Sequence, residues 1–303
     1  MDSYEGAAKL ATLVHGNGAP PARDGRGAPA AGSGTDATID THMSREWNIV
    51  VCVKQVPDAD DVSIDPDTGT LNRSDAEAVL NKPDYNAVEA ALRLKEAVGG
   101  TVTAVTMGPP FAKAVLQAAV GLGADDGVLL TDRAFGGSDT WPTSLALAAI
   151  ADELDADVVL CGEESTDSST GQVPPGIAAH NDWSQLTYVE ELEPRPEDDE
   201  LVAIRDIEGG HEEVAASLPV VVAVGFGMNE PRVAGLHRKI YSETEFEPEE
   251  YSASDLGIEE SVGLAASPTS VGGMDTADPV ERKRKMVDSV DDLVEALAEE
   301  GAI

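Results

Sequence analysis

The chain has 303 residues, of which 42% are hydrophobic, enough apolar material for the core of one large domain or two small ones. Its 57 Asp and Glu against 20 Lys and Arg give a formal net charge of −37, which argues against binding to a nucleic-acid backbone. The acidic residues are spread between apolar segments, so they are interpreted as a solvated surface rather than a ligand site. Such a surface suits a salt-rich, halophilic cytoplasm, where the Debye length falls to about 3 Å at 1 M salt.

Cysteine and histidine are too sparse and too scattered to predict a metal or catalytic centre. Cys52 and Cys161 each lie in a run of Val and Leu and lack the spacing of a zinc or iron–sulfur site. His180 and His211 have no carboxylate or nucleophile at a recognisable spacing. The chain also shows no apolar stretch of the roughly 20 residues that cross a bilayer and no basic-then-apolar signal, which predicts a soluble, cytoplasmic protein.

Residues 1–45 are rich in Gly, Ala, Pro and Asp and show no apolar periodicity. Such a segment cannot bury enough apolar surface to offset the entropy of ordering, so disorder is predicted there. Met43 lies just before the first predicted strand and offers an alternative translation start. A folded domain over 46–228 and a tail over 229–303 are predicted to follow.

From Trp47 onward, short β-branched runs alternate with amphipathic segments, which is typical of βαβ units. The predicted fold class is therefore α/β, a Rossmann-like and mainly parallel sheet with helices on both faces. Strands are expected at 48–56, 101–107, 127–130, 157–161, 186–190 and 218–224, with a hairpin around 201–214. Helices are expected at 85–98, 111–122, 143–154 and 175–180.

The tail is expected to be extended. Residues 225–279 have no sustained period and many turn residues, so no compact core is predicted there. Within 287–299, Val290, Leu293, Val294 and Leu297 form one apolar stripe, which predicts a short amphipathic helix that needs a partner surface.

Ligands of open parallel sheets bind beyond the carboxyl ends of the strands, which directs attention to four loops. These loops are 54–58, 80–84, 107–109 and 162–173. The last is rich in small hydroxyl-bearing residues and leads into a helix, so it can cradle a phosphate with backbone N–H groups, or it can simply form turns and an N-cap. The phosphate fingerprints GxGxxG and GK[ST] are absent.

Four motifs in register carry a family resemblance. They are VCVKQVPD at 51–58, LNKPDYNAVEAALRLKE at 80–96, GADDG at 123–127 and NEPR at 229–232. In this order the chain resembles an electron transfer flavoprotein beta subunit from about residue 47 to its end. The resemblance implies a heterodimer with an alpha subunit that holds most of the FAD site. It also implies an adenine nucleotide in this subunit, AMP in most of the family and a second FAD in the electron-bifurcating branch.

Carried over by position, the nucleotide contacts fall on the strand-end loops. The implied residues are Cys52, Asn81, Lys82, Pro83, Asp84, Met107, Gly162, Glu163, Glu164, Ser165, Thr166, Asp167, Ser168, Ser169, Thr170, Gly171, Gln172 and Val173. Asp167 can accept from ribose hydroxyls or merely cap a turn. Ser169 stands where the family often has Asp, and Pro174, which removes one N–H donor, stands where Gly is frequent. These departures leave the choice between AMP and FAD open.

The segment 229–236 resembles the family's recognition loop, in which an exposed leucine anchors a partner dehydrogenase. The implied partner-binding residues are Asn229, Pro231, Arg232 and Leu236, with Leu236 as the anchor. One buried leucine can contribute roughly 1.5–3 kcal/mol. Without the resemblance, Leu236 is an ordinary exposed loop leucine.

The leading functional hypothesis is a non-catalytic subunit of an electron carrier. It would accept electrons from acyl-CoA or similar flavin dehydrogenases and deliver them to a membrane quinone reductase. A first alternative is a stand-alone adenine-nucleotide-binding stress or regulatory protein, which the amphipathic tail disfavours. A second is an electron-bifurcating subunit whose own FAD reacts with NADH.

Overall fold

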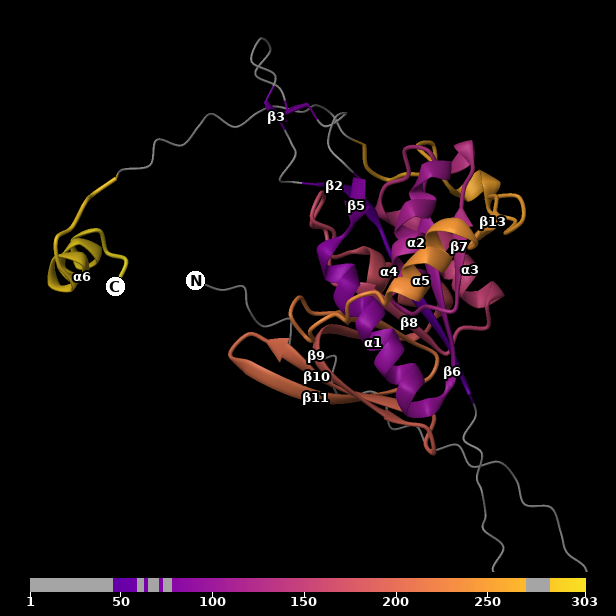
Figure 1. Cartoon of the computed structure of the whole chain (residues 1–303), viewed down its shortest axis with the longest axis horizontal. Coiled ribbons are helices and arrows are strands. Elements are labelled where there is room, and N and C mark those ends of the chain that lie inside the picture. The colour runs from indigo at the N-terminus through magenta and orange to yellow at the C-terminus, as the bar shows by residue number, and fades with distance from the viewer. Residues whose placement is uncertain (1–45, 59–62, 65–70, 73–77, 271–283) are drawn as a thin grey trace, which may run out of the picture. The chain divides into compact units, whose positions relative to one another are not determined.

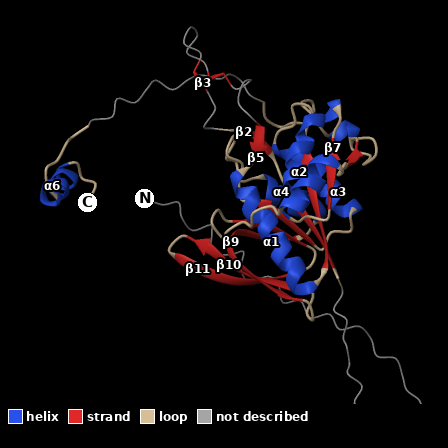
Figure 2. Cartoon of the chain, viewed as in Figure 1, coloured by secondary structure: helices blue, strands red, loops and turns tan. Residues whose placement is uncertain are grey.

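A nine-stranded sheet organises the molecule (Figures 1 and 2). The computed structural model describes residues 46–58, 63–64, 71–72, 78–270 and 284–303, all within the unit 43–303. The disorder and the alternative start predicted for residues 1–45 lie outside the described residues.

The strand order of the sheet is β11-β10-β9-β12-β8-β1-β6-β7-β13. Pairing is parallel from β9 to β13, and only the β9–β10–β11 ribbon is antiparallel. The strands are β1 (Trp47–Cys52), β6 (Gly100–Met107), β7 (Asp126–Leu130), β8 (Val158–Gly162), β9 (Ser184–Arg195), β10 (Glu200–Ile207), β11 (Gly210–Ser217), β12 (Val220–Val224) and β13 (Glu249–Tyr251). This arrangement confirms the predicted α/β fold with a mainly parallel sheet.

Helices cover both faces of this sheet. The helices are α1 (Lys82–Val98), α2 (Lys113–Leu122), α3 (Thr140–Glu153), α4 (Val173–Asn181), α5 (Leu236–Thr244) and α6 (Val290–Glu299), with 3-10 turns η1 (Pro110–Ala112), η2 (Arg133–Phe135) and η3 (Glu259–Ser261). Helices α1 and α2 share one buried cluster with the sheet, and α3 and α4 share a second one.

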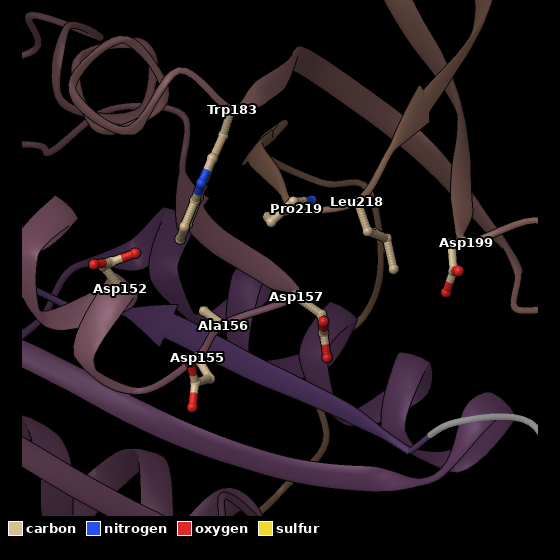
Figure 3. A pocket seen from close by; sticks show the side chains of 8 residues that line it. All are labelled: Asp152, Asp155, Ala156, Asp157, Trp183, Asp199, Leu218 and Pro219. Carbon is tan, nitrogen blue, oxygen red and sulfur yellow. The ribbon is translucent and has the colours of Figure 1, made fainter. Parts of the chain in front are cut away.

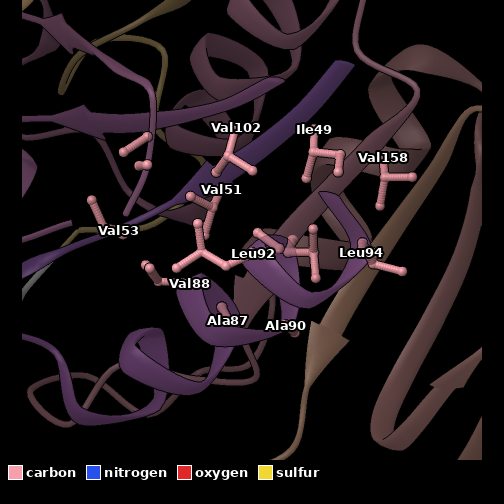
Figure 4. Packing of buried hydrophobic residues seen from close by; sticks show 14 of the residues in the cluster. Ile49, Val51, Val53, Ala87, Val88, Ala90, Leu92, Leu94, Val102 and Val158 are labelled. Carbon is pink, nitrogen blue, oxygen red and sulfur yellow. The ribbon is translucent and has the colours of Figure 1, made fainter. Parts of the chain in front are cut away.

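The two clusters follow from the period-2 alternation of strand side chains. In β1, Ile49 and Val51 pack beneath α1 (Figure 4). Val50 and Cys52 pack on the side of α3 and α4. Strand β8 alternates in the same way. Because both faces are covered, these central strands are apolar at nearly every position, as expected for a buried parallel sheet.

Helix α1 begins three residues earlier than the predicted 85–98. Pro83 stands in its first turn, where the missing N–H costs nothing, and Asn81 occupies the N-cap position. Gly99, with φ of 81°, ends the helix as predicted. The earlier start places Asp84 inside the first turn of the helix.

The predicted strand 48–56 is divided in the structure. The chain leaves the sheet after Cys52, and β2 (Gln55–Pro57) instead pairs with β5 (Ala78–Leu80) in a separate two-stranded sheet. A second small ribbon pairs β3 (Ser63–Ile64) with β4 (Leu71–Asn72). The separation brings the Lys54 backbone toward α1 instead of toward a neighbouring strand.

The expectation that the domain core ends near residue 228 is wrong. Strand β13 extends the main sheet by pairing with β7, and Phe246, Ala253 and Val262 are buried in the two core clusters. Helix α5 packs against α2, where Gly121 allows a close approach to Ser242. Residues 225–262 show no regular spacing of apolar residues, because each of their short elements contributes only a few buried side chains to the core.

The terminal amphipathic helix predicted within 287–299 is present as α6. Ser289 caps it by accepting from the Asp292 N–H, with 3.1 Å between nitrogen and hydroxyl oxygen. The four residues of the predicted apolar stripe are all exposed in this chain, namely Val290, Leu293, Val294 and Leu297. Among the residues that the structure describes, no helix combines the length and the apolar character needed to cross a membrane.

Candidate functional site

The chain reverses its direction of winding between β1 and β8. From β1 it passes through α1 on one face to β6, whereas β8 is preceded by α3 on the other face. The loops beyond the carboxyl ends of these two strands therefore diverge and leave a crevice, which is the usual ligand position in open α/β sheets.

Asp84 is a buried residue whose carboxylate connects the segments that surround this crevice. Its Oδ2 accepts from the Lys54 backbone N–H at 2.7 Å, and its Oδ1 accepts from Asn81 Nδ2 at 2.9 Å. Gly162, at the end of β8, passes so close that a methyl group there would collide with Asp84 and Pro83. Burial raises the pKa of Asp84 to about 7, although hydrogen bonds from Asn81 and from the Lys54 and Gly162 backbones oppose that rise.

Asn81 connects the same cluster to the hydroxyl-rich loop 162–173. Its side chain is buried, with Nδ2 donating to the Glu164 carbonyl at 3.1 Å and Oδ1 accepting from the Thr166 N–H at 3.0 Å. One amide side chain thus satisfies a donor and an acceptor of the loop backbone. The loop's position is fixed by the first turn of α1, which explains why the two segments form one site.

Lys54 places a positive charge in this loop. Its Nζ donates to Asp167 Oδ1 at 2.6 Å and to the Ser165 and Ser168 hydroxyls at 3.1 and 3.4 Å. Burial alone would raise the pKa of Asp167, but these hydrogen bonds and the lysine charge hold it below its ordinary value. Lys54 was not among the predicted contact residues, although it begins the strand-end loop 54–58 and could have been found there as a cation.

A cavity of about 160 Å³ opens beside the loop. It is lined by Glu163, Glu164, Ser169, Thr170, Gly171, Thr187, Tyr188 and Ala223. Five of these residues were predicted contacts. Ser169, with φ of 44°, and Gly171, with φ of 60°, both adopt the left-handed backbone that turns the loop around this cavity.

The N-terminus of α4 is a weaker anion site than the sequence suggested. Pro174 and Pro175 follow Val173 in its first turn, so two backbone donors are missing, and the Gly176 N–H bonds to the Gln172 carbonyl. Charge for an anion in this crevice therefore comes from Lys54 more than from the helix. The hydroxyls of the loop can supply further donors.

Two other predicted contacts, Cys52 and Met107, lie at the carboxyl ends of β1 and β6. Cys52 and Cys161 are opposite each other on β1 and β8, and both are buried. The neighbouring Cys52 thiol, burial and the nearby Asp84 charge raise the pKa of the Cys161 thiol well above its ordinary value, so Cys161 remains protonated. Met107 ends β6 and packs at the edge of the same cluster. Lys82 is exposed at the start of α1.

The predicted partner-binding residues separate into two groups. Leu236 is the first residue of α5 and is 75% exposed, and Pro231 is exposed as well. Asn229 and Arg232 instead make hydrogen bonds to α1, through Asn86 and Glu89. The structure thus leaves Leu236 available to a partner and engages Asn229 and Arg232 within the chain.

A larger cavity, of about 500 Å³, lies at the amino ends of the strands, away from the predicted contacts (Figure 3). It is lined by Asp152, Asp155, Ala156, Asp157, Trp183, Asp199, Leu218 and Pro219. In the part of the chain that the structure describes, no group of three or more His, Cys, Asp or Glu is arranged to hold a metal ion.

These features define an α/β domain with a polar, lysine-bearing crevice at the point where its winding reverses. A family model described as an electron transfer flavoprotein domain matches residues 68–255. The match includes α1, β8 and the loop 162–173, which form most of the crevice.

Comparison with individual proteins shows which subunit of the flavoprotein this chain resembles. The chain is 37% identical over 253 residues to the electron transfer flavoprotein subunit beta of Thermoanaerobacterium thermosaccharolyticum, covering 83% of this chain and 96% of that protein. It is 38% identical over 257 residues to protein FixA of Azotobacter vinelandii (82% and 91% covered). It is 41% identical over 226 residues to the caffeyl-CoA reductase-Etf complex subunit CarD of Acetobacterium woodii (74% and 85% covered). The chain belongs to the electron transfer flavoprotein beta subunit family, which includes FixA.

Proposed function

We propose that this chain binds an adenine nucleotide in the crevice between β1 and β8 and serves as the beta half of a heterodimeric electron carrier. The observation that carries the proposal is the contact of Lys54 with Ser165, Asp167 and Ser168 at the carboxyl ends of the strands. An ammonium surrounded by hydroxyls suits a phosphate, which needs charge-assisted donors. Membership of the family supports the heterodimer.

The residues fit an adenine nucleotide. The loop hydroxyls and Lys54 would take phosphate, and Asp167 would take a ribose hydroxyl once Lys54 turns to the phosphate. The apolar floor formed by Cys52, Cys161 and Met107 would lie against the adenine ring. These contacts bind and orient the nucleotide, and none of these residues needs to react.

The redox FAD is proposed to lie mainly in the alpha subunit, where it would accept and release electrons. We infer that donors are flavin dehydrogenases such as acyl-CoA dehydrogenase, and that the acceptor is a membrane quinone oxidoreductase. The formal charge of −37 supports a salt-rich cytoplasm as the working environment.

A second candidate function is electron bifurcation, with FAD in place of AMP in this subunit and NADH as the reductant. The likeness to the CarD subunit of a caffeyl-CoA reductase complex favours it. The cavity beside Tyr188 and Thr170 also borders the loop 162–173, which leaves room for a longer ligand.

The test is to co-express the chain with its alpha subunit in high salt, purify the complex, denature it and quantify nucleotides by chromatography. One FAD and one AMP per heterodimer would support the carrier with a structural nucleotide. Two FAD would support bifurcation. A heterodimer that released no nucleotide beyond one FAD would overturn the proposed site.

A further inference from the structure

A row of polar residues on α1 holds the segment that leads to the exposed Leu236. Asn86, Glu89, Arg93 and Glu96 are spaced 3, 4 and 3 residues apart, so they lie along one stripe of the helix. The segment 225–235, which connects β12 to α5, runs along this stripe. Each of the four residues forms a hydrogen bond with a residue of this segment.

The strongest contact joins Arg232 to Glu89. Arg232 Nε and Nη2 donate to Glu89 Oε2 and Oε1 at 2.7 and 3.3 Å, and the Arg232 backbone N–H donates to Oε2 at 3.1 Å. Glu89 is only 4% exposed, so the pair is screened less by salt than a surface ion pair. Its carboxylate also accepts from Arg93 Nε at 2.7 Å, so two guanidinium groups compensate the buried Glu89 charge.

Two further contacts complete the attachment. Arg232 Nη1 donates to Glu96 Oε1 at 2.7 Å. The side-chain amides of Asn86 and Asn229 donate to each other's backbone carbonyls at 2.7 and 3.0 Å. Side chains of α1 therefore hold a segment that belongs to no helix or strand at both Asn229 and Arg232.

Directly after this attachment the chain exposes apolar side chains. Val233 is 92% exposed, and Leu236, Ile240 and Tyr241 of α5 are exposed as well. The opposite side of α5 is fixed by its approach to Gly121 and by Arg238, whose Nη2 donates to the Ala124 carbonyl. The apolar residues thus lie on an element that is held from two sides.

We propose that the Arg232–Glu89 pair is a positioning device that fixes Val233 and Leu236 in place for docking of the electron-transfer partner. Arg232 and Asn229 act on the partner through Leu236 and do not touch it. This inference rests on the proposed role of Leu236 as a partner contact. It assigns Asn229 and Arg232 of the NEPR motif to contacts within this chain.

The experiment uses the heterodimer carrying Arg232→Gln, with Lys113→Gln as a matched loss of one positive charge in a surface ion pair. Backbone hydrogen exchange of residues 232–241 is expected to accelerate at least about tenfold in Arg232→Gln only. In turnover with an acyl-CoA dehydrogenase, KM for the heterodimer should rise by a similar factor, while kcat and the bound nucleotide stay unchanged. Unchanged exchange and unchanged KM in Arg232→Gln would overturn the positioning role.

Leu236→Ala, measured in parallel, separates this inference from the proposed function. A raised KM with normal hydrogen exchange is expected, since the anchor is removed and the attachment is intact. If Leu236→Ala raises KM and Arg232→Gln does not, the partner surface stands and the positioning role fails. If Leu236→Ala leaves KM unchanged, the partner surface itself is wrong.

Discussion

The backbone N–H of Lys54 donates to the buried carboxylate of Asp84 at 2.7 Å, and this bond joins the end of β1 to the first turn of α1. It also directs the Lys54 side chain toward the loop that follows β8, where its Nζ meets Asp167. A single helix residue thereby links the end of β1 to the loop 162–173. The consequences of this arrangement are measurable.

Lys54→Gln should weaken nucleotide binding without unfolding the chain. A charge-assisted hydrogen bond contributes roughly 1.5–3 kcal/mol, so the Kd of AMP or FAD is expected to rise by at least about tenfold. Lys54 is half exposed, and surface ion pairs contribute about 0–1 kcal/mol, so the midpoint of thermal unfolding should barely move. Calorimetry of the nucleotide-free heterodimer measures both, with Lys113→Gln as the control. Equal affinity in the two variants would contradict a phosphate role for Lys54.

Asp84 should make stability fall as pH rises toward neutrality. Its pKa is about 7 in the folded chain and 3.8 ordinarily, so between these values the folded state binds the extra proton. The unfolding free energy contributed by this group therefore decreases with increasing pH across that window, by at most about 4 kcal/mol.

The measurement is urea unfolding at several pH values from 4 to 8 for the wild type and Asp84→Asn. The variant should be less stable at pH 4–5, because its amide nitrogen would face one of the N–H groups from which Asp84 accepts a hydrogen bond. Its stability should also change less with pH in this window, because an amide does not titrate. Parallel pH profiles for the two proteins would show that Asp84 does not titrate there.

Gly162→Ala, at the end of β8, should displace the first turn of α1. An added methyl group meets Asp84 and Pro83, and neither can move away by itself because both are buried in the first turn of α1. The expected loss of stability is about 1–3 kcal/mol, accompanied by loss of nucleotide. Gly210→Ala is the matched control, since a methyl group there meets nothing within 4 Å. Unfolding curves and nucleotide content check both variants.

The sequence predicted the fold best where one local pattern determined the structure. The runs around Val51 and Leu160 are apolar on both faces, so they identified central parallel strands. The contacts of Lys54 with Asp167 and of Arg232 with Glu89 were not predicted, because each joins residues more than 100 positions apart in the sequence. Strand β13 was not predicted, because a strand of three residues is too short to show an alternation of apolar and polar positions in the sequence.

The length of the antiparallel ribbon was also underestimated. The sequence suggested a strand at 186–190, whereas β9 runs on to Arg195 because the neighbouring β10 offers it backbone partners. Glu191 and Glu193 alternate with Leu192 on this extension, so the acidic residues that obscured the strand are its solvent face. Strand propensity in such a segment is decided by pairing rather than by composition.

Helix α6 should determine assembly with the alpha subunit rather than the fold of this chain. Leu293, Val294 and Leu297 remain exposed together on one stripe, so a charge there costs this chain little but would be buried unpaired in a heterodimer. Leu293→Asp is therefore expected to reduce co-purification of the alpha subunit at least about tenfold, with the unfolding midpoint unchanged. Glu295→Gln, on the same helix but outside the stripe, should assemble normally. If Leu293→Asp assembles as well as Glu295→Gln, the stripe is not the assembly surface, and the exposed leucines of α6 need another occupant.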